Sequence, residues 1–153
     1  MATKNYSTIN PSDSQIANSL AEAIKKYNAN IKSWLIAPKD SFNEINYKTL
    51  YQAKSALLSE TNNGVLCFYN LVAQNVFGYT PEEIIGKKSL ILVPENMREE
   101  RSDLKDSVLS ENKKTQVITY RLNDVGNIIT IWAEVFPWSY YGELSIAAIV
   151  RKI

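Results

Sequence analysis

The chain has 153 residues, 45% hydrophobic and 22% charged, a composition typical of one globular domain with a tail. Its 17 basic and 16 acidic residues leave a net charge of +1, so we expect no role in binding nucleic acid. Histidine is absent and Cys67 is the one cysteine, which excludes an intrachain disulfide, a Ser-His-Asp triad, a His-ligated haem and a Cys- or His-based zinc site.

The sequence contains no candidate for a membrane segment. No run approaches the ~18 apolar residues of a membrane span, and the chain does not begin with an apolar signal segment. Together with the single cysteine, these features predict a cytoplasmic protein without a membrane partner.

The N-terminal part predicts an amphipathic helix. Ser12 and Gln15 have the spacing of a capping box. Apolar residues follow at helical spacing, namely Ile16, Leu20, Ala23, Ile24 and Tyr27. We expect a helix from about residue 13 to 36, or two helices divided near Asn28, and then a short helix within residues 39–52.

Strands are expected on both sides of a helical middle region. Apolar runs at 53–60 and 65–69 flank an Asn-Gly turn, which is a strong hairpin signal. Residues 70–112 predict helices and loops. Three further strands are rich in β-forming residues, Thr115–Leu122, Ile128–Trp138 and Leu144–Ile153. This order favours an antiparallel α+β fold over alternating βαβ units.

The segment from Asn70 to Lys87 combines caps, glycines and aromatic residues in a specific order. Asn70 is placed to cap a short helix that Gly78 closes. Thr80-Pro81-Glu82-Glu83 then begins another helix with a capping box.

The order Phe-Gly-Tyr-Thr, Glu-Glu-Ile and Gly-Lys in this segment is similar to the central signature of PAS domains. Val93-Pro94-Glu95, Asp124-Val125-Gly126 and Gly142 fit the same family, and the resemblance covers about residues 53–153. Within the superfamily the chain also resembles the PAS-related MEKHLA group, in Ala56–Ser59, Arg98–Arg101, Tyr120–Arg121 and Ala147–Ala148.

The resemblance implies a PAS-like five-stranded antiparallel sheet with short helices on one face and an N-terminal helical extension. Residues 39–153 would form the PAS-like domain. Residues 1–38 would form a tail and an amphipathic helix that packs on the sheet or at a dimer interface. Such domains sense small molecules, and the output here would pass through dimerisation or a separate effector protein.

The resemblance also restricts the cofactor. Light-sensing flavin members resemble one another in an Asn-Cys-Arg segment where this chain reads Lys87 to Val93 without cysteine, so a cysteinyl flavin is not expected. Members that bind haem use an axial His, which is absent. Noncovalent flavin or an apolar metabolite stays open. We expect Cys67 to be a small buried hydrophobe, with a redox or ligand-attachment role as the alternative.

Alternation along residues 128–136 predicts two different sheet faces. By comparison with the family, the face toward the helices would carry Ile129, Ile131 and Ala133, together with Ser145 and Ala147. These small residues leave room for a ligand, with tight packing as the alternative. The expected ligand site comprises Val76, Phe77, Ile84, Leu92, Met97, Leu104, Ile129, Ile131, Ala133, Ser145 and Ala147.

The opposite sheet face is also apolar and should be covered. We expect its cover to be the N-terminal helix, from its own chain or from a dimer mate, with a partner-docking patch at Trp132 and Phe136 as the alternative. The residues of this expected interface are Ile16, Leu20, Ile24, Trp132, Phe136 and Ile146.

Charged residues are expected mainly at the surface. Arg98–Arg101 reads as a solvated helix end, with an ion pair that gates a pocket as the alternative. Arg121 reads as a surface charge on a strand, with pairing to a ligand carboxylate as the alternative.

Three functions compete on these grounds: a ligand-binding sensor, a ligand-free dimerisation module and a small enzyme. The missing histidine and the lack of a convergent acid–base pair argue against an enzyme. We expect a sensor that acts as a homodimer or through a partner.

Overall fold

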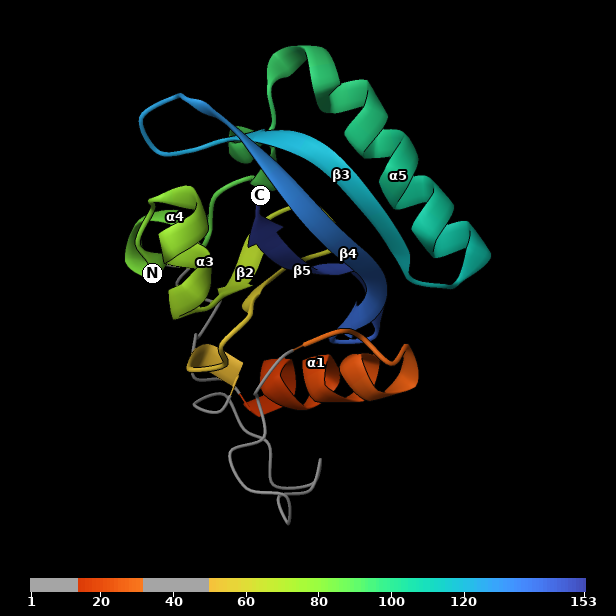
Figure 1. Ribbon diagram of the computed structural model, residues 1–153. Coiled ribbons are helices and arrows are strands. Elements are labelled where there is room, and N and C mark those ends of the chain that lie inside the picture. The colour runs from red at the N-terminus through yellow and green to blue at the C-terminus, as the bar shows by residue number, and fades with distance from the viewer. Residues whose placement is uncertain (1–13, 32–49) are drawn as a thin grey trace, which may run out of the picture.

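A five-stranded antiparallel sheet lies at the centre of the molecule in the computed structural model, which describes residues 14–31 and 50–153 (Figure 1). The strands run in the order β2-β1-β5-β4-β3, and the last strand of the chain is therefore central. Their bounds are Ala56–Glu60 (β1), Leu66–Tyr69 (β2), Thr115–Leu122 (β3), Ile128–Tyr140 (β4) and Glu143–Lys152 (β5). The expected fold class is confirmed.

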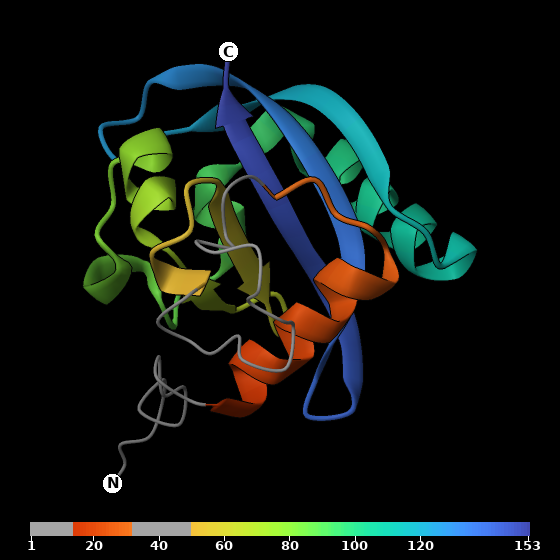
Figure 2. The ribbon, with the colours of Figure 1, turned by 60° about the horizontal axis from the view of Figure 1, so that its bottom comes forward.

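Helices cover the sheet on both sides. Figure 2 shows the N-terminal helix across one face and the remaining helices on the other. The helical elements are Ser14–Lys26 (α1), Leu71–Phe77 (α3), Pro81–Ile84 (α4), the 3-10 turns Ser89–Leu92 (η3) and Glu95–Met97 (η4), and Arg98–Glu111 (α5). None of the helices in the described parts of the chain combines the length and hydropathy that crossing a bilayer requires.

Helix α1 buries its apolar stripe against its own sheet. Ile16, Leu20 and Ile24 are almost fully buried, and the ring of Tyr27 lies 6.5 Å from that of Phe136 on β4. Burying each large apolar side chain in this way contributes about 1.5–3 kcal/mol. The packing of α1 on β4 joins the N-terminal part to the sheet.

The continuous helix expected from about residue 13 to 36 is wrong, because α1 ends at Lys26. Asn28 has a left-handed φ of 49°, and the amide of Ala29 donates back to the carbonyl of Ile24 at 2.9 Å, which closes the helix. Residues 32–36, most of the short helix expected within 39–52 and the division expected at residue 38 lie outside the described residues.

Glu134 fastens the segment after α1 to the sheet. Its buried carboxylate accepts a hydrogen bond from the backbone amide of Asn30 at 2.6 Å and another from Nε2 of Gln116 at 2.7 Å. The ammonium of Lys114 lies 3.7 Å away. These contacts join residues far apart in the sequence on one face of β4.

The local signals of the central segment are confirmed. Gly78 ends α3 with φ of 88°. Oγ1 of Thr80 accepts from the amide of Glu83 at 3.2 Å, and Oε1 of Glu83 accepts from the amide of Thr80 at 2.8 Å. The capping box therefore begins α4 at Thr80, as its sequence predicts, and α4 lies beside β2.

The β4–β5 register differs from the expected one. The two-residue turn Tyr141-Gly142, with φ of 49° and 85°, pairs Tyr140 with Glu143. Odd-numbered residues of β4 therefore pair with even-numbered residues of β5, and paired residues share a face. Grouping Ala133 with Ser145 and Ala147 was wrong: Ala133 pairs with Val150, whereas Ala147 pairs with Phe136 and Ser145 with Trp138.

The same register places Ile146 on the other sheet face from the one expected. It was expected beside Trp132, but it pairs with Pro137 and shares a face with Val135 and Ala148. The sheet face toward α5 therefore carries a larger residue than expected.

Candidate functional site

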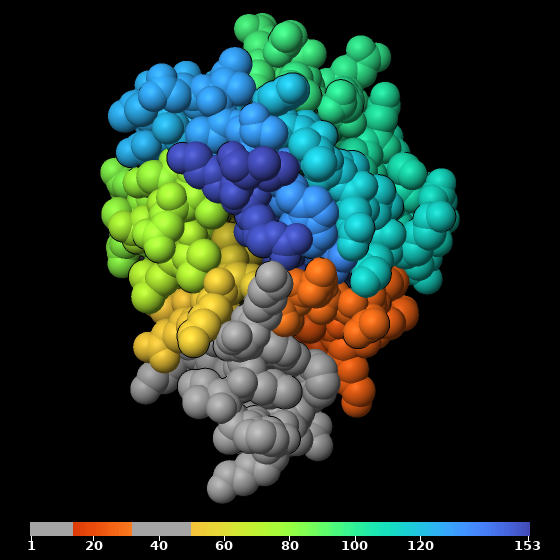
Figure 3. Space-filling model, in the orientation of Figure 1, coloured from red at the N-terminus to blue at the C-terminus, as the bar shows by residue number. Residues whose placement is uncertain are grey.

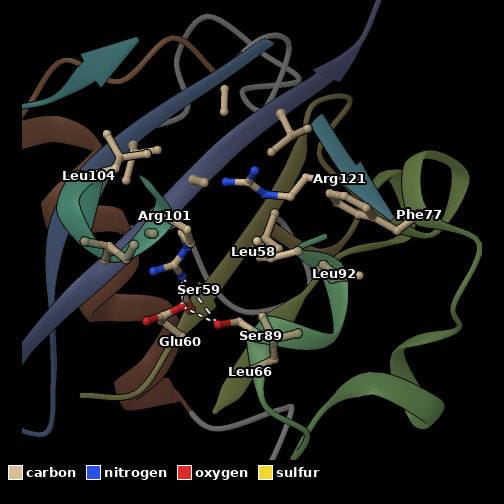
Figure 4. Close-up of a pocket in the computed structure, with 17 residues that line it drawn as sticks. Leu58, Ser59, Glu60, Leu66, Phe77, Ser89, Leu92, Arg101, Leu104 and Arg121 are labelled. Atoms are coloured by element: carbon tan, nitrogen blue, oxygen red, sulfur yellow. Dashed lines mark hydrogen bonds and ion pairs between the residues drawn. The ribbon is translucent and has the colours of Figure 1, made fainter. Parts of the chain in front are cut away.

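A cavity of about 70 Å³ lies between the inner face of the sheet and the segment from η3 to α5 (Figure 4). Strands β4 and β5 contribute mainly small or branched apolar side chains, and α3, η3 and α5 contribute larger ones. Five polar residues, Ser59 among them, also line it. The principal lining residues are Leu58, Leu66, Phe77, Leu92, Leu104, Ala133, Val135, Ile146, Ala148 and Val150, with Glu60, Ser89, Arg101 and Arg121.

The size of the cavity limits what it can hold. Pockets for drug-sized ligands and cofactors usually measure about 300–1,000 Å³. At about 70 Å³, this cavity has room for a fragment-sized molecule or a few waters, and a flavin would require the surrounding side chains to move.

The cavity includes part of the expected ligand site. Phe77, Leu92, Leu104, Ala133 and Ala147 line it. The other expected residues do not, namely Val76, Ile84, Met97, Ile129, Ile131 and Ser145.

Packing and register explain several of these differences. Ile84, Ile129 and Ile131 are buried in the hydrophobic core and pack against other core residues. The hydroxyl of Ser145 donates to the carbonyl of Thr61 at 2.8 Å, and its parity in β5 places it on the α1 side of the sheet.

Glu60 is a polar residue of this site that the sequence did not reveal. It follows a β-bulge at the end of β1, and its side chain is only 4% exposed. Its carboxylate accepts from Oγ of Ser89 at 2.8 Å and pairs with the ammonium of Lys105 at 2.6 Å and with the guanidinium of Arg101. A lone glutamate at the end of an apolar run carries no sequence signal for such a cluster.

This cluster, Glu60, Ser89, Arg101 and Lys105, separates the cavity from a surface groove. Glu60, Ser89 and Arg101 line both spaces. Arg101 was expected to be a solvated residue of a helix end, which is wrong, because its side chain is only 13% exposed and paired. Of the two interpretations of Arg98–Arg101, an ion pair beside the pocket fits Arg101.

Arg121 reaches the cavity from β3. Figure 4 shows its guanidinium pointing between Leu104 and Phe77. Its Nη1 donates to the carbonyl of Tyr120 at 2.7 Å and to Oγ1 of Thr119 at 3.4 Å. Within the described parts of the chain it forms no ion pair.

Burial lowers the pKa of Arg121 to about 10, and the positive charge of Arg101 adds to the effect. The negative charge of Glu100 acts in the opposite direction. The guanidinium therefore stays protonated at neutral pH, without an ion pair among the described residues. Arg121 is thus only partly exposed and lines the cavity, whereas the sequence suggested a surface charge.

Cys67 lies in the core, away from the cavity lining. It is fully buried, and its Sγ lies 3.6 Å from the carbonyl oxygen of Ser59. Burial raises the pKa of this thiol to about 12, so it is neutral and unreactive at ordinary pH. Among residues 14–31 and 50–153, no group of His, Cys, Asp and Glu is arranged to hold a metal.

The outer face of the sheet is covered only in part by the described residues. Helix α1, with Ile16, Leu20 and Ile24 buried, packs on β4, where Phe136 is fully buried. Trp132, on the same face, stacks with the guanidinium of Arg151 at 3.9 Å.

Beyond α1, this face carries exposed apolar side chains. Ile118 is 69% exposed, Tyr120 50% and Ile128 64%, and strand register places all three on the face of Trp132. Figure 3 shows side chains of β3 and β4 at the surface above α1. We call Ile118, Tyr120 and Ile128 the β3 patch.

Solved structures with the same architecture are PAS domains. The PAS domain of a Colwellia psychrerythraea protein matches with a TM-score of 0.60 and 21% identity, over 65% of this chain and 86% of that one. The PAS domain of an HTR-like protein from Haloarcula marismortui gives 0.56 and 16%, over 67% and 84%. A PAS domain from a two-component sensor histidine kinase gives 0.59 and 11%, over 69% and 91%.

No protein-family model and no curated protein matches the chain. At these identities the structural likeness concerns the fold, and the resemblance to the MEKHLA group stays a prediction.

Proposed function

We propose that this chain, which has the PAS fold, is a sensory signalling module that binds a small molecule in the cavity between the sheet and α5. The observation that carries the proposal is the cavity itself, which places a partly buried guanidinium without an acidic partner among apolar side chains. A structural neighbour that belongs to a sensor histidine kinase supports a role in signalling.

Strand β4 offers a route from the cavity to the other side of the sheet. Val135 lines the cavity, whereas its neighbours Glu134 and Phe136 contact the segment after α1 and Tyr27. A ligand that shifts β4 would thus alter how α1 is held. Because only differential contacts in two states transmit a signal, this proposal requires that α1 be held differently when the cavity is filled.

Native mass spectrometry of the purified protein, with an absorbance spectrum of the same sample, tests ligand binding. We expect an added mass that is lost on denaturation. A visible flavin band would show that the cavity expands to hold a flavin. A protein that shows no added mass, and whose stability no member of a broad metabolite panel changes, would contradict the proposal.

Dimerisation through the β3 patch is the second candidate function. Its support is the exposure of Ile118, Tyr120 and Ile128 on the part of the outer sheet face that α1 does not cover. Isolated exposed apolar residues are ordinary, but three on one sheet face, two on the edge strand β3 and one at the start of β4, favour a contact surface. The expected occupant is a second copy of the chain, and a separate effector protein is the alternative.

Sedimentation over a range of protein concentrations tests the dimer. We expect Ile118→Lys to weaken it at least tenfold, because a charge then enters an apolar contact. Leu144→Lys is the control, since Leu144 is similarly exposed at 61% but lies at the β4–β5 turn. A wild-type chain that stays monomeric throughout would exclude self-association and leave the effector protein. For both candidate functions, we also propose that the protein is cytoplasmic and has no catalytic role.

A further inference from the structure

The charges around the cavity do not balance. Glu60 is the acidic residue of the lining, and its two oxygens are already occupied by Ser89, Arg101 and Lys105. Arg121 thus forms no ion pair with the described residues, and only the more distant charge of Glu100 opposes its own. Removing a charge from water is costly unless the charge is paired, so this partly buried guanidinium favours an anionic partner from outside the described residues.

Unused donors of Arg121 are available to such a partner. Its two hydrogen bonds both come from Nη1 and both go to neutral acceptors. Nε and Nη2 make none with the described residues, and no fully buried side-chain nitrogen there lacks a partner, so these two atoms keep surface that is accessible to solvent or to a ligand. A guanidinium with two free neighbouring donors matches the two oxygens of a carboxylate.

The rest of the lining determines what the carboxylate would be attached to. Leu58, Phe77 and Leu104 surround the guanidinium with apolar surface (Figure 4). The volume of about 70 Å³ admits only a short chain. A dianion would bring one negative charge too many beside Glu60, and a cation would be repelled by Arg121.

We propose that the cavity binds a short-chain monocarboxylate, with the carboxylate on Arg121 and the hydrocarbon chain against Leu58, Phe77 and Leu104. This inference rests on the proposed function, since it names the chemical class of the ligand for the same cavity. A neutral apolar ligand would leave the two donors of the guanidinium unpaired, whereas a carboxylate satisfies them.

An NMR titration of the full ¹⁵N-labelled chain tests the proposal with three probes of matched length: butyrate, 1-butanol and butylammonium. We expect butyrate to shift the amides of cavity residues, including Leu58 and Phe77, in a saturable way, and the other two probes to do so at least tenfold more weakly. Arg121→Gln should weaken butyrate binding at least tenfold and remove its preference over butanol. Arg98→Gln is the matched control, because Arg98 is exposed on α5 and outside the cavity lining.

The amide spectrum and melting temperature of Arg121→Gln establish whether it is folded. Should it not be, Arg121→Lys replaces it, and a weaker preference for butyrate is expected because a single ammonium cannot form the bidentate pair. Butanol binding as well as butyrate, or an Arg121→Gln chain that keeps the preference, would overturn the carboxylate inference and leave the sensor proposal standing. No response to any probe would also overturn it, and the native mass spectrum would then decide the proposed function separately.

Discussion

Glu60 on β1 and Arg101 on α5 stand 41 residues apart in the sequence and form an ion pair at the boundary between the cavity and the surface groove. Lys105, one helical turn further along α5, pairs with the other carboxylate oxygen. One acidic side chain thus holds α5 against the strand that forms the cavity wall. The arrangement makes Glu60 a structural support of the site that it borders.

Replacing Glu60 by Ala should lower the free energy of unfolding by about 2–4 kcal/mol, because two cations then lose their counter-ion in a partly buried setting. Urea denaturation measures the change. Glu99→Ala is the control, since Glu99 is exposed on the same helix and should change stability by less than about 0.5 kcal/mol. Equal effects of the two substitutions would mean that the cluster contributes nothing beyond a surface charge.

Asn70→Ala should be among the most destabilising single changes in the chain, by about 2–4 kcal/mol. The fully buried amide accepts from the backbone of Leu57 at 3.0 Å and of Ala73 at 3.1 Å, and it donates to the carbonyls of Leu50 at 3.1 Å and Ser55 at 2.8 Å. Its removal therefore leaves buried backbone groups unsatisfied as well as an uncapped α3.

The matched control for this change is Asn75→Ala, at an exposed position of α3. Thermal unfolding followed by circular dichroism compares the two variants. If both melt within about 2 °C of the wild-type chain, the four hydrogen bonds of Asn70 do not support the fold.

Gly78→Ala should lower the stability of the fold for two reasons, backbone strain and a steric clash, whereas only the backbone strain applies to Gly142→Ala. Both glycines have a left-handed φ, 88° and 85°, but a Cβ at Gly78 would lie 2.0 Å from Oδ1 of Asp124, whereas a Cβ at Gly142 would meet nothing within 4 Å. We expect Gly142→Ala to cost about 1 kcal/mol for the backbone alone. Gly78→Ala should cost more, because Asp124 must also move.

Urea denaturation of Gly78→Ala with and without Asp124→Ala measures the steric part. The second substitution should recover part of the loss but not the backbone cost. An equal loss for Gly78→Ala and Gly142→Ala would show that Asp124 moves away freely.

Cys67 should make the protein less stable at high pH. Burial raises the pKa of its thiol from 9.0 to about 12 in the folded chain. Between these values the unfolded chain loses the proton first, so the unfolding free energy falls as pH rises, at about 1.4 kcal/mol per pH unit from this group. Below about pH 9 its contribution is constant.

Denaturation of wild-type protein and of Cys67→Ala between pH 8 and 11 tests this sign. The wild-type chain should lose stability more steeply above about pH 9, since other titrating groups are common to both. Parallel curves would contradict the raised pKa. In addition, the native thiol should resist Ellman's reagent at pH 8 and react only after unfolding.

A structural feature of this protein could be predicted from the sequence when the residues that form it are close together in the chain. The cap at Thr80, the left-handed turn at Gly78 and the alternation of β4 depend on neighbours a few residues away, so local stereochemistry made them readable. Together they sufficed for the α+β class and for the resemblance to PAS domains. The apolar stripe of α1 likewise predicted a buried helix.

Tertiary structure alone decided the composition of the cavity. The faces of Ala147 and Ile146 followed from a two-residue turn that shifts the pairing of β4 and β5 by one position, and such a slip exchanges the two faces of a strand. The partners of Glu60 and the isolation of Arg121 depend on how β1, β3 and α5 converge in space. Charge pairing and burial are set by that convergence rather than by neighbours in the chain, and no local pattern in the sequence encodes them.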